Sequence, residues 1–245
     1  MQTRVIVNGA HGKMGTMACA TLKEHPDFLL VGELGREDDL RQAIQDSEAQ
    51  IVVDLTRADS AYKNTLMIIE SGAHPVVGTT GLLSKDIQQL KEVSEAKKLG
   101  GIIVPNFSIS AVLMMRFAAI ASRYFPEVEI IEMHHQQKQD APSGTAIKTA
   151  EMIAAARKLQ KNKLHTKELL PGACGAKHEE IPIHSVRLPG VLARQQVIFG
   201  SLGETLTITD DAIDRHCYMP GLVLVCQQVQ HLNTLYYGLE HLLEN

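Results

Sequence analysis

Residues 7–15 read VNGAHGKMG, and this stretch decides the fold of the chain. Gly9, Gly12 and Gly15 give the spacing G-x-x-G-x-x-G between a β-branched run and a helical pattern from Met14 to about Glu24. Glycines at such a turn let the backbone approach a pyrophosphate and leave the helix N-terminus free to bind it. The stretch therefore indicates a dinucleotide-binding βα turn, with a plain glycine-rich turn as the structural alternative.

Short apolar runs follow at intervals and alternate with segments of helical spacing. The runs are Val5–Val7, Leu29–Val31, Ile51–Val53, Val76–Val77 and Ile102–Val104. The helical segments include Tyr62–Glu70 and Lys85–Lys98. Alternating strands and helices indicate βαβ units, and continuous apolar strands are typical of a parallel sheet covered on both faces. The sequence predicts an α/β fold that begins with a Rossmann-like parallel sheet domain.

The rhythm changes after Pro105, which indicates a second α+β domain with a mixed sheet. The expected elements are helices over 111–124 and 145–159, a strand over 128–133, and strands over 183–187, 195–199 and 205–209 without helices between them. Residues 158–180 are expected to form a surface loop. Pro220 suits the first turn of a closing helix, and apolar residues from Leu232 to Leu243 have the spacing of a last helix.

These patterns predict two domains. Residues 1–105 and 218–245 would form the dinucleotide-binding domain, and residues 106–217 would bind substrate and support oligomerisation.

Composition limits the class of partner. The 245 residues are 44% hydrophobic with a formal net charge of −4, which argues against nucleic acid as a partner. Aromatic residues make up 4%, and there is no Trp to stack on bases.

The longest apolar stretch, 111–121, is interrupted by Arg116 and is too short to cross a bilayer. The four cysteines have no Cys-x-x-Cys spacing, and Met1 lies too close to the first apolar run for a signal peptide. We expect a soluble cytoplasmic protein without a metal site.

The end of the second expected strand decides which ribose is recognised. An acidic residue there hydrogen-bonds a 2′-hydroxyl, whereas an arginine accommodates a 2′-phosphate. Residues 32–37 read GELGRE, so Arg36 favours NADPH while Glu33 leaves NADH open. A solvated ion pair is the plain alternative for both residues. We expect NADPH to be preferred, or both cofactors to be used.

Residues 129–146, EIIEMHHQQKQDAPSGTA, carry the chemistry. In an extended strand His134 and Lys138 share one face and His135 points the other way. For His134 and Lys138 to reach one small substrate, the chain must curl after His135. A histidine suits proton delivery near neutral pH, and a lysine can stabilise developing charge. A structural histidine in a strand is the alternative.

The end of the same stretch predicts a carboxylate site. Ser143 can cap a helix that begins near Thr145, and the free N–H groups at a helix start bind anions. A simple cap is the alternative. Since all these features lie within twelve residues, together they predict a site for a small substrate that bears two carboxylates.

The whole string from Glu129 to Ala146 resembles the signature of the dihydrodipicolinate (4-hydroxy-tetrahydrodipicolinate) reductase family. The resemblance covers the whole chain. Further matching segments are Gly9–Gly15, Gly78–Gly81, Pro105–Ser108, His184–Arg187 and Gly203–Leu206.

The resemblance implies hydride transfer from NAD(P)H to a cyclic, unsaturated imino dicarboxylate, giving tetrahydrodipicolinate in the diaminopimelate route to lysine. It implies His134 as the proton donor and Lys138 as the second essential cation. Substrate carboxylates would be held by His135, Ser143, Gly144 and Thr145. Cofactor-binding residues would be Gly9, Ala10, His11, Gly12, Lys13, Met14, Arg36, Gly78, Thr79, Thr80, Val104, Pro105, Asn106 and Phe107. From the residues alone, Gly78–Gly81 could equally be a simple turn. The family is usually a homotetramer assembled through the sheet of its second domain.

Some positions depart from the family pattern. Gly35 stands where many relatives carry an acidic ribose-binding residue, which puts NADH preference in doubt. Asp210 and residues 194–196 stand where histidine is common, and residues 216–218 after the matching Arg215 are unusual. None of these positions is the proposed proton donor.

Two other classes of function remain to be compared. A nucleotide-sensing regulator would share the first domain but would not need His134, Lys138 and the Ser143 cap together. A semialdehyde dehydrogenase needs a nucleophilic cysteine paired with a histidine, and no cysteine lies in residues 129–146.

Overall fold

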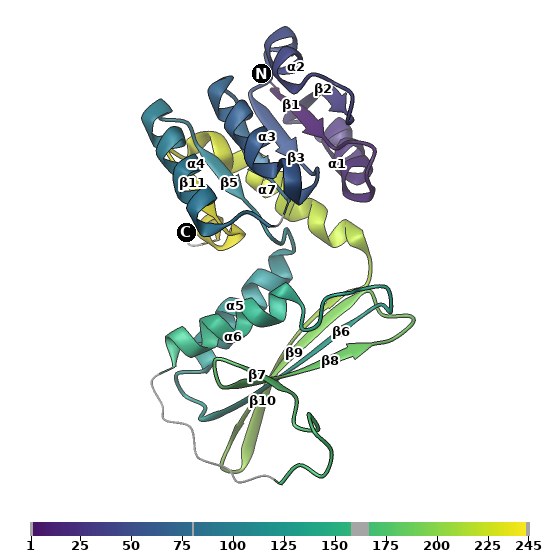
Figure 1. Cartoon of the computed structure of the whole chain (residues 1–245), viewed down its shortest axis with the longest axis vertical. Helices are drawn as coiled ribbons and strands as arrows, with labels where there is room; N and C mark the ends of the chain where they lie inside the picture. Colours follow the sequence, from purple (N-terminus) through teal and green to yellow (C-terminus); the bar gives the residue numbers. More distant parts are fainter. Residues whose placement is uncertain (1, 80, 158–166, 244–245) are drawn as a thin grey trace. The chain divides into compact units, whose positions relative to one another are not determined.

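The computed structural model describes residues 2–79, 81–157 and 167–243 (Figure 1). Contacts divide these residues into two compact units. Unit 1 runs to Ile109 and resumes at Arg215, and unit 2 is the continuous segment Ser110–Asp214. Unit 2 is therefore inserted within the sequence of unit 1.

A parallel sheet forms the centre of unit 1. Its strands among the described residues are β1 (Thr3–Asn8), β2 (Phe28–Leu34), β3 (Ile51–Asp54), β4 (His74–Val77), β5 (Gly101–Ile103) and β11 (Leu235–Tyr237). They lie in the order β11-β5-β4-β3-β1-β2, and every pairing is parallel. The predicted Rossmann-like parallel sheet is confirmed.

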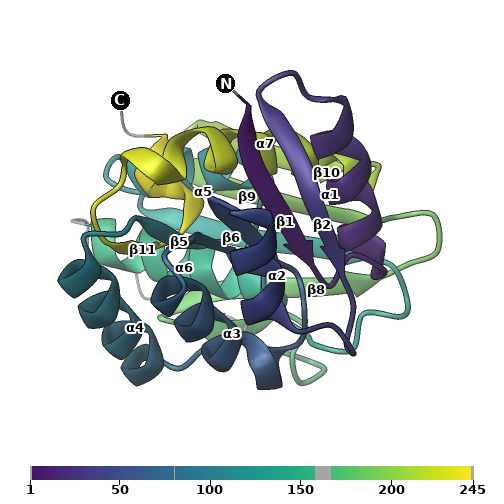
Figure 2. The same ribbon diagram turned by 90° about the horizontal axis from the view of Figure 1, so that it is seen from above.

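Helices cover both faces of this sheet, which explains why its strands are apolar throughout. Figure 2 shows α1 and α7 along one face and α2, α3 and α4 along the other. The bounds are α1 (Lys13–Glu24), α2 (Leu40–Ser47), α3 (Ala58–Glu70), α4 (Ser84–Lys97) and α7 (Met219–Gln228). The short 3-10 helices η1 (Arg215–Tyr218), η2 (Val229–His231) and η3 (Leu239–Leu242) also belong to unit 1. Among the described residues, no helix has the length and apolarity required to cross a membrane.

Unit 2 is built on a mixed sheet, as predicted. Its strands among the described residues are β6 (Glu127–His134), β7 (Ala176–His178), β8 (Ile181–Arg187), β9 (Ala193–Ser201) and β10 (Glu204–Ala212), in the order β10-β9-β6-β8-β7. Strands β6 and β8 are parallel, and the other pairs are antiparallel. The helices α5 (Ile109–Ala121) and α6 (Gly144–Ala156) lie on one face of this sheet (Figure 1). That face buries Val128, Ile130 and Glu132 from alternate positions of β6.

The prediction of a last helix after residue 232 is wrong. Residues 235–237 form β11 beside β5, and η3 follows. Gly238 between them has φ +105°, a backbone conformation that residues with a side chain rarely adopt and that interrupts a continuous helix. Leu235 and Leu239 are buried from these two short elements, so the apolar spacing reflected burial and not a continuous helix.

Smaller differences concern element ends. Pro220 lies in the first turn of α7, as predicted. Helix α6 ends at Ala156, before the predicted end near Leu159, and Leu159 is outside the described residues. The predicted loop 158–180 contains the short strand β7, which pairs with the start of β8.

Candidate functional site

The glycine loop after β1 is packed so closely that side chains cannot be added. Gly9 has φ +83°, and a Cβ there would lie 2.8 Å from the carbonyl oxygen of Leu55. A Cβ on Gly15 would lie 2.1 Å from the carbonyl oxygen of Gly9. The loop therefore lies against the chain that follows β3. Because β1 pairs with β2 on one side and β3 on the other, this is the switch point where open α/β sheets bind ligands.

The start of α1 is suited to an anion. Its N-cap residue, Gly12, supplies no side-chain hydrogen bond, and its first turn carries no acidic residue. Lys13 is exposed at the first helical position. The helix dipole and the backbone N–H groups of this turn can therefore interact with phosphate.

At the end of β2, the acidic side chain is already paired. Glu33 lies 2.7 Å from Lys23 Nζ, and the hydrogen bond from Lys23 lowers the pKa of Glu33. Arg36 is exposed. The ring of His11 lies beside Gly35, where a Cβ would be 3.0 Å from His11 Cδ2. An arginine and an imidazole thus lie where the sequence predicts ribose recognition.

The loops after β4 and β5 also lie together. A Cβ on Gly78 would lie 2.7 Å from Cε2 of Phe107, which is 4% exposed. Val104 and Thr79 are buried, and the Thr79 hydroxyl donates to the Thr56 carbonyl at 3.2 Å. The structure thus collects the predicted cofactor residues at the carboxyl ends of β1, β2, β4 and β5. Thr80 is outside the described residues.

In unit 2, strand β6 presents Glu132 and His134 on one face, two residues apart. His134 Nδ1 lies 2.5 Å from Glu132 Oε2. The Glu132 side chain is 0% exposed, whereas that of His134 is 16% exposed. The carboxylate therefore lies in the core and the imidazole at its edge.

Arg187, at the end of β8, pairs with the same carboxylate. Its Nη1 and Nη2 lie 3.0 Å and 2.9 Å from the two oxygens of Glu132, and Nη2 also donates to the Asp140 carbonyl at 2.7 Å. Burial by itself raises the pKa of Glu132. Hydrogen bonds from His134, Arg187 and Ser185 outweigh this and lower it to about 2. Glu132 is consequently a carboxylate at neutral pH.

Lys138 belongs to the same network. The chain turns after His135, and the Lys138 amide donates to the His135 carbonyl at 3.1 Å. Lys138 Nζ lies 2.9 Å from both carboxylate oxygens of Asp140. The Asp140 carbonyl in turn accepts from Arg187, so one set of hydrogen bonds connects His134 and Lys138.

The start of α6 follows directly. Ser143 is the N-cap, 2% exposed, and its hydroxyl accepts from the Ala146 N–H at 3.2 Å. The first turn carries no acidic residue, and a Cβ on Gly144 would meet nothing within 4 Å. Nδ1 of His135 is buried without a hydrogen-bond partner among the described residues. These features suit a carboxylate at the start of the helix.

Reasoning from the sequence overlooked Glu132 and Arg187. The signal was present, because residues two apart in a strand share a face and Glu132 therefore had to lie beside His134. Arg187 could not be found in this way. It depends on the parallel register that pairs His134 with Arg187 across β6 and β8.

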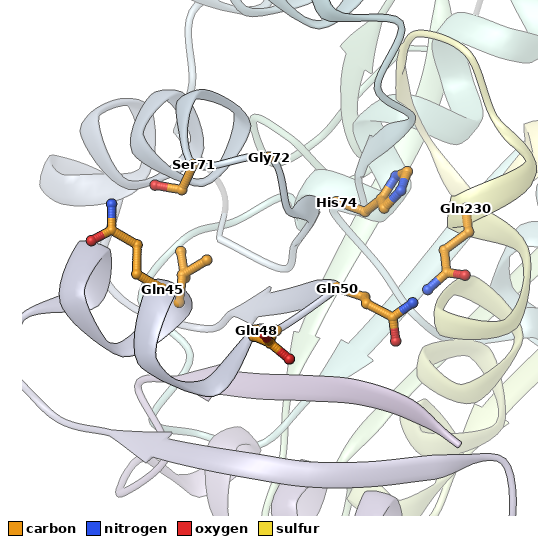
Figure 3. Close-up of a pocket in the computed structure, with 9 residues that line it drawn as sticks. Gln45, Glu48, Gln50, Ser71, Gly72, His74 and Gln230 are labelled. Atoms are coloured by element: carbon orange, nitrogen blue, oxygen red, sulfur yellow. The ribbon is translucent and has the colours of Figure 1, made fainter. Parts of the chain in front are cut away.

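A separate hollow of about 510 Å³ lies at the opposite edge of the unit 1 sheet. Figure 3 shows Gln50 and Gln230 pointing toward one another across it, with His74 nearby. Gln50 precedes β3 and His74 begins β4, so these are the amino ends of the strands. The hollow is therefore not part of the predicted cofactor site.

Comparison with known families covers nearly the whole chain. Residues 3–107 match the family model described as "Dihydrodipicolinate reductase, N-terminus", and residues 110–243 match "Dihydrodipicolinate reductase, C-terminus".

Individual relatives agree with these matches. The chain is 64% identical to a 4-hydroxy-tetrahydrodipicolinate reductase of Legionella pneumophila, over 99% of this chain and 100% of that protein. It is 51% identical to a protein of the same name from Coxiella burnetii, again over 99% and 100%. A solved structure of dipicolinate-bound dihydrodipicolinate reductase from a Paenisporosarcina species aligns with a TM-score of 0.91 at 40% identity, covering 98% of this chain and 99% of that one.

Proposed function

The chain belongs to the dihydrodipicolinate reductase family, and we propose that it carries out the family's NAD(P)H-dependent reduction with His134 as proton donor and Lys138 as second essential cation. The activity is that of a 4-hydroxy-tetrahydrodipicolinate reductase, an oxidoreductase of lysine biosynthesis through diaminopimelate. The observation that carries the residue roles is the hydrogen-bond network from His134 through Glu132 and Arg187 to Asp140 and Lys138.

Reduction of an unsaturated imino ring adds a hydride and a proton, so an acid is needed at the ring. The nicotinamide supplies the hydride when it is bound. His134 Nδ1 is engaged by Glu132, so Nε2 is the ring atom that would deliver the proton. Lys138, held by Asp140, would stabilise negative charge on the substrate.

The substrate carboxylates would bind at the start of α6. Gly144 and Thr145 would offer backbone N–H groups there, Ser143 would shape the turn, and His135 would bring a polar ring atom that is otherwise unpartnered. A dicarboxylate fits this arrangement, and the relative bound to dipicolinate supports the choice.

Unit 1 fits a nicotinamide dinucleotide. The backbone at Gly9 and Gly15 leaves no room for a Cβ, and the start of α1 has no side-chain cap. Both features suit a pyrophosphate, which residues 9–14 would hold. Gly78, Thr79 and residues 104–107 would line the nicotinamide pocket, and Thr80, a further predicted residue, is outside the described residues.

We propose that NADPH is preferred or that both cofactors are used. Arg36 is exposed, Glu33 is paired with Lys23, and the ring of His11 lies beside Gly35. The ratio of kcat/KM for NADPH to that for NADH measures this preference. It should fall in Gly35→Asp, which places a carboxylate beside the ribose; a wild-type ratio well below one would contradict the proposal.

The direct test couples the purified protein to a synthase that makes its unstable substrate and follows NADPH absorbance. His134→Gln should lower kcat about 10²-fold or more, the usual scale for loss of a general acid. His231→Gln, an exposed histidine in η2, is the matched control and should keep activity. Full activity in His134→Gln would remove this residue from its proposed role.

We also propose a homotetramer assembled through the face of the unit 2 sheet that lies opposite α5 and α6. Ile131, Met133, Val186 and Ile198 share that face and are half-buried in the single chain. Ile198→Glu should reduce the mass measured by light scattering. A monomeric wild-type protein would contradict the proposal.

We further propose a cytoplasmic location, because a reductase needs a steady supply of reduced dinucleotide.

A further inference from the structure

Glu132 is an ionised carboxylate on the side of β6 that faces the core. Its neighbours on this face, Val128 and Ile130, are buried and apolar. Placing a charge there costs free energy, and a buried ion pair can often be replaced by apolar residues without loss of stability. The position of Glu132 is therefore better explained by what it holds than by stability.

The carboxylate holds two groups at once. It accepts from His134 Nδ1 at 2.5 Å and from both terminal nitrogens of Arg187. Two parallel bonds from a planar guanidinium fix the plane of a carboxylate, which a lysine cannot do. The orientation of the His134 ring is consequently determined by Glu132, whose own orientation is determined by Arg187.

Arg187 also reaches the loop that carries Lys138. Its Nη2 donates to the carbonyl of Asp140, whose side chain binds Lys138 Nζ. The Arg187 guanidinium therefore contacts both Glu132, which binds the His134 ring, and Asp140, which binds the Lys138 ammonium group.

We propose that Glu132 and Arg187 form a positioning pair for the two residues assigned above to catalysis. Glu132 keeps the proton of neutral His134 on Nδ1 and aims Nε2 at the substrate, while Arg187 fixes Glu132 and the loop at Asp140. The inference rests on the proposed role of His134. Neither Glu132 nor Arg187 is assigned a contact with the substrate.

The proton count is consistent with this role. The imidazolium gives its Nε2 proton to the substrate and becomes a neutral ring that keeps Nδ1–H toward Glu132. Solvent then returns a proton to Nε2. Glu132 remains a carboxylate and Arg187 remains charged, so only His134 changes its protonation state.

The first test determines the tautomer of His134 in the wild-type protein. Nitrogen-15 NMR of histidine-labelled protein distinguishes the two neutral tautomers, and His134→Gln identifies the His134 signals. We expect neutral His134 to carry its proton on Nδ1. A proton on Nε2 with a bare Nδ1 would overturn the proposal.

The second test removes the pair. Glu132→Leu/Arg187→Met takes away both charges together and so avoids leaving one of them buried alone. The tautomer should shift to Nε2–H, which neutral imidazole prefers in water. In steady-state kinetics kcat should fall about 10-fold or more, with the KM for NADPH unchanged. The solvent isotope effect on kcat should rise, because proton delivery becomes slower. If the pair had a purely structural role, the tautomer, kcat and the isotope effect would change only through loss of folded protein. Thermal melting measures that loss.

Controls separate the possible failures. Glu70→Gln breaks an exposed Glu–Arg pair of 2.7 Å with Arg41 and should leave kcat and the isotope effect unchanged. If His134→Gln loses activity while the double variant keeps the kcat, isotope effect and tautomer of the wild type, the positioning pair is refuted and the role of His134 stands. If His134→Gln is fully active, the proposed function itself fails.

Discussion

Glu132→Gln is expected to remove a large part of the pH dependence of stability below pH 5. The pKa of Glu132 is about 2 in the folded chain against an ordinary value of 4.5. When folding lowers the pKa of a carboxyl, its ionisation stabilises the folded state at pH values above the pKa of the unfolded chain. This stabilisation is lost as the pH falls from 4.5 toward the pKa in the folded chain. At about 1.4 kcal/mol per pKa unit, folding favours the ionised over the protonated form of Glu132 by about 3 kcal/mol. About 2 kcal/mol of it should be lost between pH 5 and pH 3.

The assay is urea-induced unfolding of wild type and Glu132→Gln at several pH values in this window. The quantity that tests the reasoning is the difference between their free energies of unfolding, because carboxylates common to both proteins cancel. This difference should shrink by about 2 kcal/mol from pH 5 to pH 3, since the glutamine does not titrate. A difference that stays constant with pH would refute the assignment of a low pKa to Glu132.

Three further changes test other parts of the structure. Phe199→Ala should lower the free energy of unfolding by about 3–5 kcal/mol, because this ring is 0% exposed in the core of unit 2; a loss below 1 kcal/mol in urea titrations would contradict that packing. Gly15→Ala should raise the Kd for NADPH measured by fluorescence titration at least about 10-fold, because its Cβ would lie 2.1 Å from the Gly9 carbonyl oxygen, and an unchanged Kd would argue against this loop as the cradle. Ser143→Ala should cost about 1 kcal/mol of stability by removing the cap on the Ala146 N–H, whereas Ser143→Asp, which can still cap, should recover most of it.

The sequence predicted the parallel sheet well because its signal is local. The glycine spacing at Gly9, Gly12 and Gly15 fixes a turn between one strand and one helix, and each buried strand of unit 1 is a short apolar run. The Ser143 cap was found for the same reason, since an N-cap and its helix are adjacent in sequence.

The parts that the sequence did not predict depend on distant residues. Residues 235–237 become a strand because β5 leaves an edge that β11 can pair with, and apolar spacing alone cannot reveal that edge. The bounds of helix α2 were not predicted from the sequence either, as its eight residues bury only Leu40 and Ile44. The link from Glu132 to Arg187 spans 55 positions and follows from the register of β6 on β8.

The insertion of unit 2 within unit 1 sets the order in which the chain can fold during synthesis. Everything needed for unit 2 has left the ribosome once Asp214 emerges, whereas the unit 1 sheet lacks its edge strand until Leu235–Tyr237 follows. We expect a released chain truncated after residue 230 to protect unit 2 from protease while leaving unit 1 digestible; equal protection of both would contradict this order. Unit 1, though its sequence begins first, would be the last to complete its fold.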